Sequence, residues 1–181
     1  IRQNGKPRQV VAQATKQGFL YVFDRRTGQP IWPIEERPVP QSDVPGEWPS
    51  PTPPFPTRPA PLAKQSFTEK DINPYLPKEA QEEVRARLRS YRNEGLFTPP
   101  SFEGSVSMPG HNGGANFGTS AVDPDRGEFY VVHKSLPTVL RITLPAPPRG
   151  GGPGGGGRGG GNAIVTPEEK AGLMAKAREL V

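Results

Sequence analysis

Few side chains in this sequence stand in a pattern that suggests chemistry, and Lys16 is the foremost of them. It lies in the short connection Lys16-Gln17-Gly18 between two strand-like runs. An ammonium group held in such a place can stabilise negative charge that develops on a ligand oxygen atom. The alternative is a solvated lysine beside a hairpin turn, because lysines are mostly exposed. The local pattern leaves both interpretations open.

The other titratable candidates form no recognisable constellation. His111 lies in a glycine-rich segment and His133 ends a strand-like run, so each could act as a base, and His111 is the better candidate. No second ligand stands at metal-ligand spacing from either histidine. The carboxylates show no spacing suited to paired acid–base work; they are Asp43, Glu47, Asp71 and Asp123. The absence of cysteine excludes disulfides, zinc–thiolate sites, c-type haem attachment and thiol catalysis within these residues.

Composition indicates that only short segments can position these groups. The 181 residues include 25 prolines and 22 glycines, and 32% are hydrophobic, so the core must come from a few apolar runs. The net charge of +5 is spread over loops and one helix with acidic residues interleaved, which favours a solvated surface over nucleic-acid binding. Because the sequence starts at Ile1 and stops inside a helical pattern, we expect an internal piece of a longer protein.

The first strands are predicted to form a meander. Residues 9–14 and 19–23 read as a hairpin, and the turn of residues 24–28 places Gly28 where a positive φ is needed. Asp24 can accept hydrogen bonds from backbone N–H groups of its own turn. A third short strand is expected to start at Ile31-Trp32.

The later strands are also predicted to form hairpins, with no crossover helices between the strands. Residues 119–123 and 128–133 read as a second hairpin and residues 139–142 as a further strand, whereas residues 104–118 read as glycine-rich turns. Strands in clusters, with no alternation of strand and helix, favour an antiparallel all-β sandwich or propeller.

A proline-rich loop and two helices interrupt the strands. Residues 38–61 contain ten prolines, a density that predicts neither a paired strand nor a helix, with Trp48 and Phe55 as possible anchors. Residues 77–93 read as a helix whose apolar face combines Ala80, Val84, Leu88 and Tyr91.

The end of the chain reads as a glycine-rich linker, residues 149–163, and then a helix within residues 164–181. Thr166 and Glu169 form a capping box, with Pro167 at the first helical position. The linker contains Arg-Gly-Gly at residues 149–151 and 158–160 but lacks the aromatic residues that a nucleic-acid-binding tail needs beside such units, so no nucleic-acid partner is expected.

Residues 14–32 carry the most informative motif, A-x-K-x-G-x-x-Y-x-x-D-x-x-T-G-x-x-x-W. Strand alternation places Tyr21 and Phe23 on one face, Phe19 joins them, and Trp32 is a large apolar plug. This unit resembles the tryptophan-docking repeat of the pyrroloquinoline quinone (PQQ) dehydrogenases, in which such a plug locks one propeller blade against the next.

Further segments extend the resemblance over residues 8–144. They are E-E-R-P-V-P at 35–40, G-E at 46–47, S-P-T at 50–52, P-F-P at 54–56, E-G-L-F-T-P-P-S at 94–101, the P-G…G-G-A-N-F-G segment at 109–118 and D-P at 123–124. The likeness is to the membrane-associated glucose, quinate and polyol type rather than the methanol type. Two departures stand out: Pro53 replaces a glutamine, and Phe117 replaces a tryptophan.

The resemblance implies an all-β fold, a partial β-propeller of four-stranded antiparallel blades over residues 1–148. It implies PQQ as cofactor, Ca²⁺ beside it, and oxidation of a small alcohol, sugar or polyol, with electrons passed to ubiquinone or another acceptor in the periplasm. The matching lysine, Lys16, would stabilise charge on the quinone C5 oxygen. Asn116 would approach the quinone edge and Gly118 would permit close backbone approach, although both also suit plain turn roles.

The resemblance also implies what these residues lack. The catalytic aspartate and the calcium ligands of the family are expected to precede this sequence, so the piece alone is expected to be inactive. The alternative function is a non-catalytic propeller that serves as a scaffold for protein interaction. Lys16 together with the Gly113–Gly118 segment distinguishes the two, because a pure scaffold needs neither.

Overall fold

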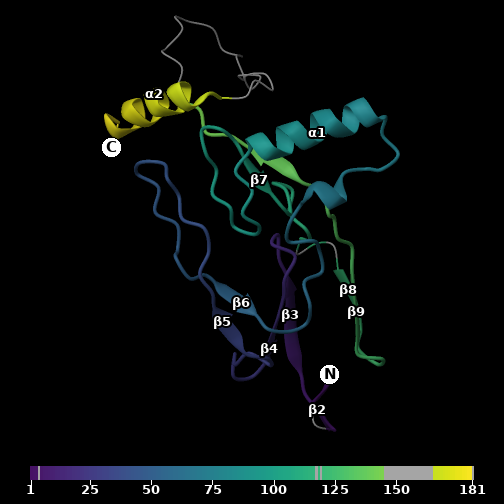
Figure 1. Cartoon of the computed structure of the whole chain (residues 1–181). Coiled ribbons are helices and arrows are strands. Elements are labelled where there is room, and N and C mark those ends of the chain that lie inside the picture. The colour runs from purple at the N-terminus through teal and green to yellow at the C-terminus, as the bar shows by residue number, and fades with distance from the viewer. Residues whose placement is uncertain (4, 117, 119, 145–164, 181) are drawn as a thin grey trace, which may run out of the picture.

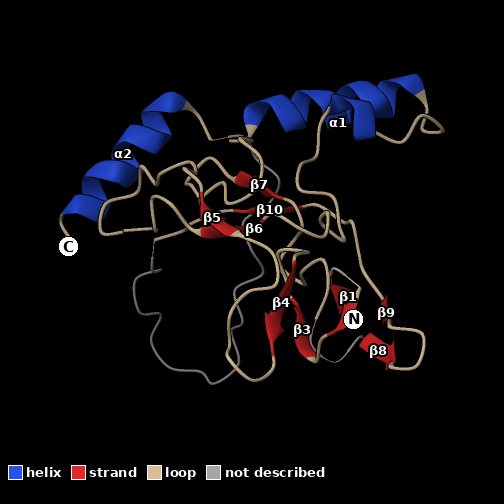
Figure 2. Cartoon of the chain, turned by 90° about the horizontal axis from the view of Figure 1, so that it is seen from below, coloured by secondary structure: helices blue, strands red, loops and turns tan. Residues whose placement is uncertain are grey.

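The computed structural model describes residues 1–3, 5–116, 118, 120–144 and 165–180. In these residues the strands pair two by two in antiparallel sheets, and both helices lie along one side of the strand pairs (Figures 1 and 2). The strands are β1 Arg2–Gln3, β2 Lys6–Pro7, β3 Val10–Ala14, β4 Leu20–Asp24, β5 Ile34–Glu36, β6 Pro54–Pro56, β7 Ser105–Ser107, β8 Ser120–Asp123, β9 Glu128–Val131 and β10 Thr138–Leu140. The helices are α1 Lys78–Ser90, α2 Pro167–Arg178 and the 3₁₀ turn η1 Glu69–Asp71. The four-stranded blade stays a prediction.

The β3–β4 hairpin forms as predicted and supplies the largest part of one core. The strands pair in register from Val10 opposite Asp24 to Ala14 opposite Leu20. One face buries Ala14, Leu20 and Val22 together with Ile31 and Ala115, and Trp32 packs half-buried against this cluster. The hydrophobic effect therefore favours the hairpin, and the glycine-rich segment that holds Ala115 is part of the same core.

The third strand of the meander is shorter than predicted and begins earlier. It is reduced to a bridge between Phe23 and Pro30, followed by a 2.8 Å hydrogen bond from Ile31 N–H to the Val22 carbonyl oxygen. The Asp24 turn that precedes it has the expected form, because Asp24 Oδ1 accepts the N–H groups of Arg26 and Thr27 at 2.9 and 3.0 Å.

The prediction that residues 38–61 contain no paired strand is wrong. β6 lies within them and pairs with β5, with Phe55 opposite Glu35. The prolines of β6 occupy alternate positions, opposite Ile34 and Glu36, where their missing N–H groups are not needed for the ladder. Pro53 and Pro51 then act only as acceptors, for the N–H groups of Arg37 and Val39.

The prediction that residues 104–118 are all turns is also wrong at their start, where β7 pairs with β10. Helix α1 covers this pair: Val84, Leu88 and Tyr91 of its predicted apolar face line one cavity with Val106 of β7 and Val139 of β10. On the exposed side of α1, Glu83 and Arg87 form an ion pair at 2.6 Å.

Helix α2 begins with the predicted capping box. Thr166 Oγ1 accepts the Glu169 N–H at 3.2 Å, the Glu169 carboxylate accepts the Thr166 N–H at 2.8 Å, and Pro167 opens the helix. The glycine-rich linker predicted at residues 149–163 lies outside the described residues.

Candidate functional site

Lys16 lies in a turn that several backbone contacts hold in place. The turn joins β3 to β4, and the N–H of Gly18 donates to the carbonyl oxygen of Thr15 at 2.9 Å. Gly18 has a φ of +79°, and its carbonyl oxygen accepts the N–H of Leu62 at 2.7 Å. Leu62, which directly follows the proline-rich loop, is thus bonded to the Lys16 turn. This bond fixes the backbone of the turn.

The glycine-rich segment contacts Lys16 from another side. Gly114 N–H donates to the Lys16 carbonyl oxygen at 2.7 Å, and the Cα of Gly113 lies against the Lys16 stem. Gly114 is itself enclosed, because a Cβ on it would lie 2.7 Å from the Cβ of Ala63 and 2.9 Å from Cγ of Pro109. Lys16 and Gly113–Gly114, which lie about a hundred residues apart, therefore form one packed unit.

A cavity of about 480 Å³ opens beside this unit, within the size range of small-molecule sites. Lys16 and Glu47 are the ionisable side chains among its lining residues in the part of the chain that the structure describes. The remaining wall is mostly apolar and rich in proline; it includes Val39, Pro49, Pro53, Leu96, Phe97, Pro99, Pro100, Met108 and Pro109. Prolines have few backbone alternatives, so the wall is stiff.

Lys16 is exposed, and within the described residues its ammonium has no hydrogen-bond or ion-pair partner. Of the other predicted cofactor contacts, Asn116 is half-buried and donates to the Asn112 carbonyl oxygen at 3.3 Å. Gly118 is exposed, and a Cβ on it would meet no atom of the described residues within 4 Å. Neither residue lines the cavity, although both belong to the segment that contacts Lys16.

An aromatic row supports the proline-rich wall of the cavity. Phe19 contacts Tyr21 and Phe55 with ring centroids 6.2 and 5.5 Å apart, and Phe55 contacts Phe97 at 5.7 Å. Tyr21 stacks on Phe23 at 6.4 Å, as strand alternation predicted. Phe55 is therefore an anchor of the loop, but the same expectation for Trp48 is wrong, because Trp48 is 92% exposed.

Sequence reasoning missed Glu47 and Phe97 as site residues. The Glu47 carboxylate accepts the hydroxyl of Ser42, and no partner at a fixed spacing marked it in the sequence. Phe97 has a φ of +63°, a region that non-glycine residues rarely adopt, and its ring contact with Phe55, which favours this conformation, is not visible in the sequence. The departure at Pro53 lies in the cavity wall, whereas that at Phe117 lies outside the described residues.

The histidines show no catalytic arrangement. His111 Nδ1 lies 3.2 Å from Oγ1 of Thr138, and His133 is exposed beyond β9. Among the described residues no group of three histidine, aspartate or glutamate side chains could hold a metal ion. No helix in the described ranges is both long and apolar enough to cross a membrane.

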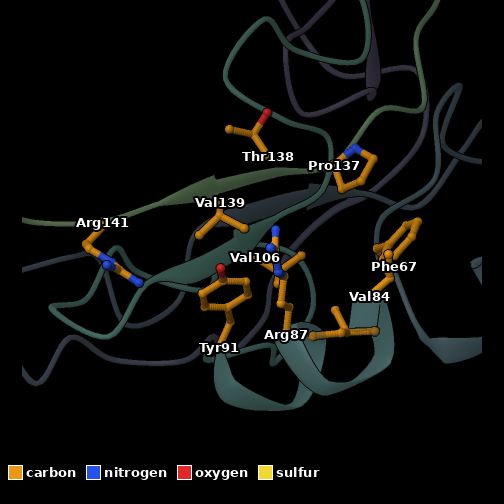
Figure 3. Close-up of a pocket in the computed structure, with 10 residues that line it drawn as sticks. Phe67, Val84, Arg87, Tyr91, Val106, Pro137, Thr138, Val139 and Arg141 are labelled. Atoms are coloured by element: carbon orange, nitrogen blue, oxygen red, sulfur yellow. The ribbon is translucent and has the colours of Figure 1, made fainter. Parts of the chain in front are cut away.

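A second cavity, of about 370 Å³, lies on the other face of β7, between this strand, the start of β10 and helix α1 (Figure 3). Val106 lines it, whereas the next residue, Ser107, lines the Lys16 cavity, because successive side chains of a strand point to opposite faces. Its polar lining groups are Arg87, Tyr91, Thr138 and Arg141. None of the predicted site residues faces this cavity.

An ionic cluster joins α2 to the proline-rich loop. Lys170 lies 2.8 Å from Asp43 and 2.7 Å from Glu103, and Arg92 lies 2.8 Å from Glu94. Burial opposes ionisation of Asp43, but the hydrogen bond and charge of Lys170 outweigh it and lower the pKa of this carboxyl. The cluster stabilises the arrangement of the loop rather than offering a reactive group.

The sequence is similar to known proteins of one family. Residues 1–167 match the family described as glucose/ethanol/alcohol dehydrogenase, β-propeller domain, PQQ. The glycerol dehydrogenase large subunit of Gluconobacter oxydans is 39% identical over 127 residues, 69% of this chain and 17% of that protein. The quinate/shikimate dehydrogenase (quinone) of Acinetobacter baylyi is 35% identical over 129 residues, 71% and 16% of the two chains. The quinoprotein glucose dehydrogenase of Escherichia coli is 34% identical over 157 residues, 84% and 18%.

The chain thus spans about a sixth of the length of these relatives. No solved structure matches the chain. The family match covers the packed unit of Lys16 and Gly113–Gly114, together with the β3–β4 hairpin and the proline-rich loop. This chain belongs to the PQQ glucose/ethanol/alcohol dehydrogenase β-propeller family.

Proposed function

We propose that this chain is part of a PQQ-dependent dehydrogenase that oxidises a hydroxyl group of a small alcohol, sugar or polyol to a carbonyl. The observation that carries the proposal is Lys16: a cation with no partner among the described residues, in the wall of a stiff cavity, in a family whose members are quinoprotein dehydrogenases. Electrons would pass to ubiquinone or another acceptor. The relatives act, by their names, on glycerol, quinate or shikimate, and glucose, so a polyhydroxylated substrate is the natural candidate.

The residues present fit an anionic, planar cofactor on one side. PQQ supplies a quinone that accepts a hydride when bound. The ammonium of Lys16, which no described residue pairs with, would stabilise negative charge on a cofactor oxygen, and the Lys16 backbone is fixed by Gly18 and Gly114. A lysine whose backbone is held in place needs less reorganisation as charge develops than one on a loose loop, so the turn supports the electrostatic role.

Asn116 and Gly118 are proposed to contact the cofactor from the glycine-rich segment. Neither residue lines the Lys16 cavity. For this role the cofactor would have to extend from the cavity past Lys16 to the glycine-rich segment. The Asn116 amide is a hydrogen-bond donor, as its 3.3 Å bond to the Asn112 carbonyl oxygen shows, and an amide of this kind suits a cofactor oxygen as acceptor.

The remaining features belong to the whole protein. We propose that residues 1–148 form part of a propeller of four-stranded blades, completed by strands from the rest of the protein, followed by a linker at residues 149–163 and a helix that starts the next segment. Ca²⁺ ligands and the catalytic carboxylate are proposed to come from outside these residues. A periplasmic location follows from the same proposal.

The test uses the full-length protein that contains this chain. With PQQ and Ca²⁺ present, dye-linked oxidation should be measured over a panel of alcohols, sugars and polyols, for the wild type and for Lys16→Ala and Lys16→Arg. We expect turnover by the wild type and a loss of about 100-fold or more in Lys16→Ala, because removal of one electrostatic stabiliser costs that order. Lys16→Arg should retain part of the turnover.

Lys6→Ala is the matched control, since Lys6 is an exposed lysine of the β1–β2 hairpin that lines no part of the cavity. Equal thermal stability of the lysine variants would exclude unfolding as the cause. No turnover by the wild type on any substrate would favour the scaffold function, and undiminished turnover in Lys16→Ala would remove Lys16 from the site. Residues 1–181 alone are expected to be inactive with PQQ and Ca²⁺.

A further inference from the structure

We propose that Gly113 is a positioning residue that sets the direction of the Lys16 side chain. A Cβ built on Gly113 would lie 2.7 Å from Cγ, 2.8 Å from Cβ and 2.9 Å from Cα of Lys16. Separations below 3.0 Å are not found for real Cβ atoms, so a larger residue at position 113 and the present Lys16 stem exclude each other. The proposal rests on the proposed function, because it assigns Gly113 a purpose through Lys16.

The contact is with the part of Lys16 that has no freedom to move away. The far end of a lysine can rotate away from a new methyl group, but Cα and Cβ are fixed to the backbone. That backbone is held by the Gly114 N–H at 2.7 Å and, through Gly18, by Leu62 at 2.7 Å. A methyl group on residue 113 must therefore turn the Lys16 stem or push the two segments apart.

Gly113 is also fixed from its own side. Its N–H donates to the carbonyl oxygen of Gly110 at 2.7 Å, and it is buried with a φ of +83°. Gly110 is in turn bonded to the carbonyl oxygen of Leu136 at 2.9 Å, at the approach to β10. Backbone hydrogen bonds thus hold the glycine-rich segment in place where it contacts the aliphatic part of Lys16, so the segment cannot easily move to accommodate a larger residue.

The chain offers a close control. Gly127, in the β8–β9 turn, also has a positive φ, +68°, but a Cβ on it would meet no atom within 4 Å in the part of the chain that the structure describes. Gly127→Ala therefore introduces the backbone strain of alanine at positive φ without touching Lys16. Gly113→Ala introduces the same strain and the overlap with Lys16.

The experiment measures PQQ binding as well as turnover in the full-length protein. Binding is followed by the quenching of tryptophan fluorescence on titration with PQQ. We expect Gly113→Ala to weaken PQQ binding about tenfold, the order of one charge-assisted hydrogen bond, and to reduce turnover about 100-fold, while Gly127→Ala leaves both within about twofold of the wild type. In a Lys16→Ala background, Gly113→Ala should have little further effect on binding, because the ammonium that it displaces is gone.

If Gly113→Ala does not fold, the double variant Lys16→Gly/Gly113→Ala decides the matter. Loss of the Lys16 Cβ and Cγ removes the overlaps at 2.8 and 2.7 Å and leaves only that with Cα at 2.9 Å. The double variant should therefore fold, with a thermal midpoint below that of Lys16→Gly by about the amount that Gly127→Ala loses from the wild type. Failure of the double variant to fold would overturn the proposal, as would equal PQQ binding by Gly113→Ala and Gly127→Ala. A wild type that binds no PQQ would instead overturn the proposed function.

Discussion

Phe97 packs edge-to-face on Phe55, with ring centroids 5.7 Å apart and the ring planes 87° apart. This contact joins two segments that the chain separates by about forty residues, the proline-rich loop and the segment that precedes β7. Phe97 adopts a φ of +63° to make it. The wall of the Lys16 cavity therefore includes backbone strain, which an aromatic contact offsets.

The strain and the contact at Phe97 can be separated with two variants. Phe97→Ala loses the ring and keeps the unfavourable φ, whereas Phe97→Gly loses the ring and relieves the strain. We expect Phe97→Gly to be more stable than Phe97→Ala by about 1 kcal/mol. Hydrogen exchange at the amides of Arg37 and Val39, which donate to Pro53 and Pro51, would report this locally. Equal protection in the two variants would show that residue 97 is not strained in solution.

The pairing of the proline-rich loop with β5 could not be predicted from the sequence. A high proline density indicates that regular pairing is unfavourable, but it does not reveal which N–H positions a ladder needs. In β6 the prolines occupy the positions at which a backbone N–H would point away from β5, so no ladder hydrogen bond is lost and a short strand forms. Register is a property of two segments, and it could not be read from residues 38–61 alone.

The local features were predicted with more success than the distant ones. The β3–β4 hairpin, the Asp24 turn, the apolar face of α1 and the Thr166 capping box follow from neighbouring residues. Lys16 was found through the family motif, but its contact with Gly113 and Gly114 depends on segments about a hundred residues apart. Glu47 carried no local signal at all, because only the folded loop places it at the Lys16 cavity.

Glu47 should oppose the binding of an anionic cofactor at Lys16. Both side chains line one cavity, so removal of the carboxylate charge raises the local potential. We expect Glu47→Gln, which keeps an acceptor for Ser42, to bind PQQ about two- to fivefold more tightly in the full-length protein. Glu36→Gln is the control, since Glu36 bonds Thr52 and does not line the cavity. Weaker binding in Glu47→Gln would indicate that Glu47 itself holds the cofactor or its cation.

Lys170 should hold α2 against the proline-rich loop. Lys170→Met leaves Asp43 and Glu103 without this cation, while Glu103 Oε2 is already buried with no hydrogen-bond partner among the described residues. Because Lys170 is partly exposed, we expect a loss of only about 1 kcal/mol, seen as faster hydrogen exchange in α2. Lys176→Met on the same helix, which is exposed, should change exchange little. Similar exchange in both variants would mean that the cluster does not anchor the helix.

Asp71 should make the stability of the fold depend on pH in acidic solution. The hydrogen bond from the Lys64 ammonium, followed by those from the Thr68 backbone and hydroxyl, lowers the pKa of Asp71 to about 2. A carboxyl whose pKa is lower in the folded state stabilises the fold above its ordinary pKa of 3.8 and loses that contribution as the pH falls through about 2. The affected segment matters for the site, because Leu62 and Ala63 beside Lys64 pack on Gly18.

The measurement is the thermal midpoint between pH 2 and pH 5 for the wild type, Asp71→Asn and Asp125→Asn. Asp71→Asn should be less stable than the wild type at pH 5, and the difference should shrink as the pH falls toward 2, because the wild-type carboxyl begins to take up its proton there. Asp125 makes no ion pair among the described residues, so Asp125→Asn should follow the wild type across the range. A difference between Asp71→Asn and the wild type that stays constant with pH would show that the charge of Asp71 does not contribute.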